Sequence, residues 1–191
     1  MGWLELFYDL VYVATFIQLG NALSANVGLM GFLAVAGLLA PLWLTWSHFT
    51  FFMNRFVVDD LAHRVIVFAQ MFAIGTMAVC VPSVFHGDSQ SFVLAYAAAR
   101  LVIAALYARA WVHTPGARDV AAPFALGFGF GALCWLLSLT VPAPWSYMLW
   151  ALAFAIDVVL PFTHRVFRLT SRFPVDMMHM AERYGLLTII V

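Results

Sequence analysis

The sequence predicts an all-α integral membrane protein, a polytopic helical bundle with six complete spans, the start of a seventh, and a cytoplasmic N-terminus. The composition is the first reason: of 191 residues, 65% are hydrophobic and 9% are charged, and the mean hydropathy is +0.97. Such values are typical of membrane bundles. The second reason is a set of apolar runs long enough to cross a hydrocarbon layer of about 30 Å as helices. The third is an alternation of arginine between connections.

The short connections predict one transmembrane domain over residues 1–191, with antiparallel neighbouring helices and no soluble domain. The expected spans cover about 3–24, 29–56, 62–84, 91–112, 120–141 and 145–164, and a partial span covers 184–191. The final GLLTIIV has no polar flank, so we expect a piece of a longer chain. The first run lacks a basic n-region, which argues against a cleaved signal peptide.

Positive charge predicts the orientation of these spans. The chain has no Lys and nine Arg, and eight of the nine fall in alternate connections or after span six: Arg55, Arg64, Arg109, Arg118, Arg165, Arg168, Arg172 and Arg183. The other connections, SANVG, FHGDSQS and VPAPW, contain none. By the positive-inside rule the basic connections are cytoplasmic, so the N-terminus is inside. Arg100 alone stands within a complete span.

Span one carries two acids, Glu5 and Asp9, in WLELFYDLVYVATFIQL. Carboxylates at membrane depth cost several kcal/mol unless they are paired, hydrated or protonated. At 100° per residue both acids share one face of the helix with Tyr12. We therefore expect this face to turn into the bundle.

Span two places His48 on a polar stripe with Thr45, and its cytoplasmic end runs into the connection NRFVVDDLAHR. That connection contains Asn54, Arg55, Asp59, Asp60, His63 and Arg64. The spacing of its acids from His63 would let a carboxylate and an imidazole share a helical face as metal ligands. The commoner explanation is an Asp that caps span three beside inside-facing arginines. A metal site needs more ligands than these, so no metal and no cofactor is predicted.

Spans four to six add further polar or small residues. Span four has Arg100 on one side with two tyrosines, and the glycines of FALGFGFGAL in span five permit a close helix approach. In span six, Pro161 lacks the N–H that would bond the carbonyl of Asp157. The freed oxygen beside a carboxylate suits water, a proton carrier or a small cation, or else marks a tolerated bend.

The helical rise predicts where the polar residues meet. Asp9, Asp157 and His48 lie roughly 9, 10 and 12 Å from the inner ends of their spans, and Arg100 lies nearer the midplane. With Glu5, these residues form an expected polar cluster in the inner half of the bundle. Arg100 pairs there with Asp157 or with Asp9, and the sequence leaves this choice open.

Three segments resemble a known family. WLELFYDLVYV resembles the opening signature of the bacterial low temperature requirement A family, FMNRFVVDDLAHR its second block, and AERYGLLTIIV the start of its third. The third block contributes Glu182, Arg183 and Gly185. The resemblance implies an integral bacterial membrane protein, about twice this length, connected by name with growth in the cold. It supplies no biochemical reaction.

The function that the sequence favours is proton- or cation-linked transport of a small solute through the carboxylate cluster, in the bacterial inner membrane. The alternative is a structural or cold-stress protein without transport. No enzyme is predicted, because the sequence has no nucleophile elbow, phosphate-binding loop or zinc motif. The expected partners are the lipid bilayer and a proton, small cation or small solute. Nucleic acid is not expected, because no basic patch extends beyond the loop arginines. The sequence leaves open whether the protein forms homo-oligomers.

Overall fold

The computed structural model describes residues 2–56, 60–163 and 175–190, and over these residues the chain is all-helical with no strand. The predicted fold class is confirmed. The helices are α1 (Trp3–Ala25), α2 (Leu29–Arg55), α3 (Leu61–Phe85), α4 (Gln90–His113), α5 (Arg118–Leu137), α6 (Trp145–Val159) and α8 (Met177–Ile190). Short 3-10 turns cover Pro115–Ala117, Ser138–Thr140 and Leu160–Phe162. Asp59, Arg165, Arg168 and Arg172 lie outside the described residues.

Six helical segments of the described chain are long and apolar enough to cross a membrane: α1 to α4, Pro115–Thr140 and Trp145–Phe162. Their bounds follow the runs of apolar sequence, because hydropathy and length decide which segments partition into lipid. The α-helix of the sixth segment ends at Val159, and the 3-10 turn that follows contains Pro161. The proline therefore ends the regular helix near the cytoplasmic end that the sequence predicts.

The last helix begins earlier than the sequence led us to expect, at Met177 instead of residue 184. Asp176 explains this start, since its carboxylate accepts hydrogen bonds from the N–H groups of Met178 (3.0 Å) and His179 (3.2 Å). A side chain that satisfies the free N–H groups of the first turn fixes where a helix begins. Hydropathy does not register that cap, so the sequence placed only the apolar end of this helix.

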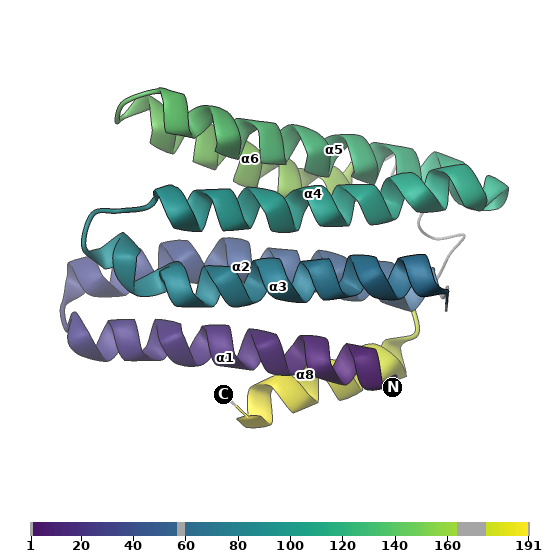
Figure 1. The fold of residues 1–191 in the computed structure, drawn as a ribbon, viewed down its shortest axis with the longest axis horizontal. Helices are drawn as coiled ribbons and strands as arrows, with labels where there is room; N and C mark the ends of the chain where they lie inside the picture. The colour runs from purple at the N-terminus through teal and green to yellow at the C-terminus, as the bar shows by residue number, and fades with distance from the viewer. Residues whose placement is uncertain (1, 57–59, 164–174, 191) are drawn as a thin grey trace.

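Successive helices run antiparallel, and the chain packs as a bundle in which α2 lies behind α3 (Figure 1). The N-terminus, the α2–α3 and α4–α5 connections and the start of α8 all lie at one end of the bundle, at the right of Figure 1. We call this the basic end, because the helix ends that meet there carry Arg55, Arg64, Arg109 and Arg118. This arrangement has the alternation that the arginine pattern predicts. That the basic end faces the cytoplasm stays a prediction.

The interior of the bundle is rich in aromatic side chains, whereas large apolar side chains also cover its outside. Phe72 on α3 is 79% exposed and Leu126 on α5 is 74% exposed. An apolar exterior of this kind is suited to lipid contact. On α6 the buried residues are Ala153 and Asp157, and the other residues of this helix are exposed or half-buried.

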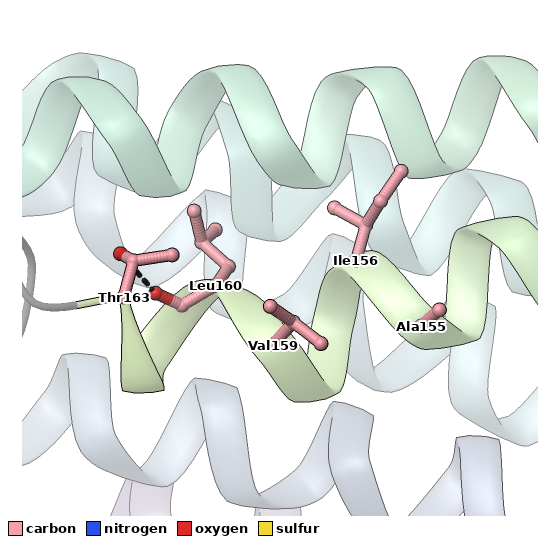
Figure 2. Close-up of a pocket in the computed structure, with 5 residues that line it drawn as sticks. All are labelled: Ala155, Ile156, Val159, Leu160 and Thr163. Atoms are coloured by element: carbon pink, nitrogen blue, oxygen red, sulfur yellow. Dashed lines mark hydrogen bonds between the residues drawn. The ribbon is translucent and has the colours of Figure 1, made fainter.

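A shallow apolar groove runs along the outer side of α6, where its helix gives way to the 3-10 turn (Figure 2). Its lining residues are Ala155, Ile156, Val159, Leu160 and Thr163. The one polar lining group, the Thr163 hydroxyl, is occupied because it donates to the Leu160 carbonyl at 2.9 Å. The groove therefore offers contact area without a free hydrogen-bonding group.

Two glycines of α5 lie close to side chains of the segment that contains α6. A Cβ atom built on Gly127 would lie 2.5 Å from Cδ2 of Leu160, and one built on Gly131 would lie 3.6 Å from Oδ1 of Asp157. A larger residue at Gly127 would require Leu160 to move. These glycines therefore let α6 sit close enough to α5 to bring Asp157 into the bundle.

Candidate functional site

The described charged residues of the bundle interior form two buried ion pairs, where the sequence led us to expect one cluster. Asp9 pairs with Arg183, and Asp157 pairs with Arg100. All four side chains are at most 1% exposed. Each acid therefore has its own arginine, and the choice that the sequence left open for Arg100 falls on Asp157.

The first pair is bidentate. Arg183 donates from Nε to Oδ2 of Asp9 at 2.9 Å and from Nη2 to Oδ1 at 2.6 Å. The indole Nε1 of Trp46 donates to the same Oδ1 at 2.8 Å. Both carboxylate oxygens of Asp9 thus have partners, and the planar guanidinium matches the carboxylate along two parallel bonds.

Aromatic rings enclose the Arg183 guanidinium. Its Cζ lies 5.7 Å from the centre of the Trp46 ring and 5.9 Å from that of Tyr8. Tyr184, next in the chain, packs edge-on against Trp46 with ring centres 4.8 Å apart. Aromatic faces attract a cation and exclude water at the same time, which strengthens the ion pair.

The second site joins three helices. Arg100 on α4 binds Oδ1 of Asp157 on α6 through Nη2, and its Nη1 lies 3.2 Å from Nδ1 of His48 on α2. The His48 ring also lies near the backbone carbonyl of Asp157, to which Pro161 has no N–H to donate. Below the guanidinium, the centre of the Phe128 ring lies 4.5 Å from Cζ.

Two polar atoms of this second site have no hydrogen-bond partner in the described part of the chain. Oδ2 of Asp157 and Nε of Arg100 are buried and have no hydrogen-bond partner among the described residues. Because Arg has no acceptor and Nη1 donates, Nδ1 of His48 accepts, and the imidazole proton is then on Nε2. The Arg100, His48 and Asp157 site therefore keeps a free carboxylate oxygen, which the Asp9 site lacks.

Helix α2 separates the two sites. Trp46 and His48 are two residues apart, and two steps along an α-helix turn a side chain by about 200°. Trp46 consequently faces α1 and α8, whereas His48 faces α4 and α6. Helical rise and periodicity predicted similar depths for His48 and Asp9. They do not show that the two side chains lie on opposite sides of α2.

Glu5 and Asn54 lie at the basic end, where they hold α8. The Glu5 carboxylate accepts from the Gly2 N–H at 3.1 Å and lies 3.3 Å from Nε2 of His179. The Asn54 side chain binds the backbone of Asp176 twice, at 2.7 and 3.1 Å. Glu5 therefore belongs to the docking of α8 and not to a cluster with His48 and Asp157.

Asp60 has the capping role that was the commoner explanation of its segment. Its Oδ1 accepts from the His63 N–H at 2.7 Å, and its Oδ2 pairs with Arg109. The His63 side chain is buried against Phe52, with ring centres 6.3 Å apart. Both oxygens of Asp60 are thus engaged by protein groups. His63, Arg55 and Arg64 have further interactions within the protein.

Comparison with known proteins settles which family these residues belong to. The sequence profile of the bacterial low temperature requirement A protein (LtrA) family matches residues 1–191. The chain belongs to the LtrA family. An uncharacterized protein of Rhizobium meliloti (strain 1021) is 37% identical over 107 residues, which cover 54% of this chain and 26% of that protein. The match thus spans about a quarter of the relative's length. No solved structure matches the chain.

The three LtrA-like blocks meet in space although they are far apart in the sequence. Asp9 of the first block binds Arg183 of the third across 174 positions, and Asn54 of the second holds the residue that caps the helix of the third. Within the third block, Glu182 is exposed and Gly185 is half-buried. Arg183, which the charge pattern grouped with cytoplasmic arginines, is instead fully buried.

The sequence interpretation missed Trp46 as a partner of Asp9 and Arg183 as its counterion. A partial signal existed for Arg183. A buried cation favours an acid in an apolar helix, and Arg183 stands directly before an apolar helical run, although Arg64 does so too and the signal does not by itself select Arg183. This multi-span LtrA protein contacts lipid with its outer side chains and keeps its charges paired inside.

Proposed function

We propose that this LtrA protein carries out proton- or cation-linked transport of a small solute across the bacterial inner membrane, and that Asp157 is the carboxylate that exchanges the proton or cation. One observation carries the proposal: Oδ2 of Asp157 is buried without a hydrogen-bond partner among the described residues. Intramembrane acids facing a bundle interior usually mark ion or proton pathways. Asp9 does not qualify, because three hydrogen bonds use both of its oxygens.

The neighbours of Asp157 suit a reversible exchange. Arg100 favours the ionised carboxylate, and burial favours the protonated one, so the two effects oppose each other. A proton that binds Oδ2 removes the negative charge and weakens the contact with Arg100, whose Nη1 keeps its place beside Nδ1 of His48. Loss of that proton restores the ion pair. Each exchange thus shifts Arg100 between two partners that are already in contact with it.

A small cation would use the same oxygen. The Asp157 carboxylate and the backbone carbonyl that Pro161 frees are oxygen ligands, which hard cations prefer. Arg100 opposes a bound cation by repulsion, so cation binding requires the guanidinium to turn toward His48. The proton therefore fits this site with less rearrangement than a metal cation does.

The second candidate is a structural protein for membrane adaptation, and the Asp9 site favours it. In this site both carboxylate oxygens of Asp9 are bonded and aromatic rings surround the guanidinium, so the pair joins α1 to α8 and leaves only Nη1 of Arg183 without a partner among the described residues. In that function the Asp157 pair would likewise fasten α6 to α4. The two candidates differ in whether loss of the Asp157 charge changes transport or only folding.

Flux measurements on the full-length protein in liposomes test the proposal. A pH-sensitive dye and a cation-sensitive dye would follow wild type, Asp157→Asn and Asp9→Asn at equal amounts of inserted, monodisperse protein. We expect Asp157→Asn to abolish flux, and Asp9→Asn to lower the yield of folded protein while the flux per folded molecule persists.

Asp60→Asn is the matched control, because it makes the same chemical change at a partly exposed pair at the basic end. It should leave flux unchanged. Flux retained by Asp157→Asn contradicts the assignment of Asp157. Absence of flux from wild type under proton, sodium and potassium gradients contradicts ion-linked transport and leaves the structural candidate.

A further inference from the structure

A second group of buried polar side chains lies between α1 and α3, outside both ion pairs. Tyr8 and Tyr12 stand one turn apart on α1, and Gln70 stands on α3. All three are 0% exposed. Both hydroxyls and both polar atoms of the Gln70 amide have no hydrogen-bond partner among the described residues.

These groups are neighbours. The rings of Tyr8 and Tyr12 have centres 5.1 Å apart, and the Tyr8 hydroxyl lies close to both the Tyr12 hydroxyl and the Gln70 amide, yet none of these contacts has the geometry of a hydrogen bond. Four unpartnered polar atoms therefore gather in one place inside a membrane bundle. Leaving one such atom without a partner is unfavourable, and lipid cannot supply a partner.

The chemistry of the group selects its ligand. Two phenols and one amide offer several donors and several acceptors but no charge. Arg183 and Asp9 lie within electrostatic range on the Tyr8 side and neutralise each other there, whereas Arg100 on the Tyr12 side disfavours a bound cation. An anion would lack a positive donor within the group itself. A small, neutral molecule that both donates and accepts hydrogen bonds fits, and water is the smallest such molecule.

We propose that Tyr8, Tyr12 and Gln70 form a water-binding site inside the membrane span. Water in this site satisfies the phenol oxygens and the amide, none of which has a hydrogen-bond partner among the described residues. The site lies beside the Asp9 and Arg183 pair, because Cζ of Arg183 is 5.9 Å from the centre of the Tyr8 ring, and Arg100 lies within electrostatic range of Tyr12. It is a property of the folded bundle and holds whether or not Asp157 exchanges protons.

Radiolytic hydroxyl-radical footprinting of the full-length protein in nanodiscs tests the site. Radicals form from water and oxidise aromatic rings beside bound water, even where the bulk solvent has no access. Tyr107 is the internal control: it is 1% exposed, its hydroxyl is engaged by Arg55, and its ring packs against Phe52 and Phe124. We expect Tyr8 and Tyr12 to be oxidised several-fold faster than Tyr107.

A substitution of Gln70 tests whether the labelling depends on this site. Gln70→Leu keeps the size of the side chain and removes two of the polar atoms, so the rate at Tyr8 should fall toward that of Tyr107. Gln18→Leu makes the same change at a half-buried position of α1 and should leave the pattern of wild type. An unchanged rate at Tyr107 in each variant shows that the bundle is intact.

Protection of Tyr8 and Tyr12 in wild type to the level of Tyr107 would overturn the proposal, since a dry interior gives no local radicals. Equal loss of labelling in Gln70→Leu and Gln18→Leu would also overturn it. Neither readout depends on transport, so failure of this site is distinguishable from failure of the flux experiment.

Discussion

Removal of Arg183 alone should destabilise the bundle more than removal of both members of its ion pair. Arg183→Leu leaves the Asp9 carboxylate fully buried with only the Trp46 indole as a donor. Breaking a buried ion pair by deleting one partner costs about 3–5 kcal/mol. Asp9→Leu leaves the guanidinium buried and unpaired, and a similar loss of about 3–5 kcal/mol is expected.

The double variant Asp9→Leu/Arg183→Leu removes both charges and leaves one unsatisfied group, the Trp46 N–H. An unpaired buried donor costs about 1–3 kcal/mol. If the two single effects were independent, the double variant would lose roughly 6–10 kcal/mol. The coupling between Asp9 and Arg183 is therefore expected to be at least about 3 kcal/mol.

Unfolding in detergent micelles, followed by circular dichroism for wild type, both single variants and the double variant, measures this coupling. The pair Asp60 and Arg109 provides the matched control, because its side chains are 45% and 25% exposed and its coupling should be at most about 1 kcal/mol. Single effects at Asp9 and Arg183 that add without coupling would refute the inference that these charges neutralise each other in the folded bundle.

Two further predictions concern helix contacts. Gly127→Ala should lower the free energy of unfolding by about 1 kcal/mol, because its Cβ would lie 2.5 Å from Cδ2 of Leu160, whereas Gly129→Ala, whose Cβ meets nothing within 4 Å, should be neutral or stabilising. Thermal unfolding in micelles measures both, and equal effects would contradict the close approach. Asn54→Ala removes both hydrogen bonds to the Asp176 backbone and should speed amide hydrogen exchange in the first turn of α8, with α4 as the unaffected reference. Unchanged exchange there would show that Asn54 does not hold α8.

The sequence predicted the spans well because membrane insertion depends on quantities that a sequence contains. Length and mean hydropathy decide which segments cross the bilayer, and the short connections make successive helices antiparallel. The start of α8 was missed for a different reason. It depends on the Asp176 cap and on Asn54, and a single hydrogen-bonded cap leaves no mark on hydropathy.

The site was predictable only in part. Burial of Asp9, Asp157 and Arg100 followed from helical periodicity, since each polar face must turn away from lipid. Which face meets which depends on helix adjacency, and α2 separates Asp9 from the Asp157 site. Trp46 and His48, two residues apart, therefore serve different ion pairs.

The Asp9 pair also explains why the first and third LtrA-like blocks belong together. An acid in α1 and an arginine in α8 are each unfavourable in lipid alone, and each becomes acceptable when the other is its partner. Asp9 and Arg183 are 174 positions apart and fully buried in one contact. The charge on α1 is therefore neutralised by the charge on α8. A substitution of Asp9 in the first block or of Arg183 in the third affects the same ion pair. Asp157 is paired as well, but its Oδ2 has no hydrogen-bond partner among the described residues, whereas both oxygens of Asp9 are bonded. One bundle thus contains an ion pair in which both carboxylate oxygens are bonded and another in which one carboxylate oxygen is free within the described chain, and the second is the one that we propose exchanges a proton.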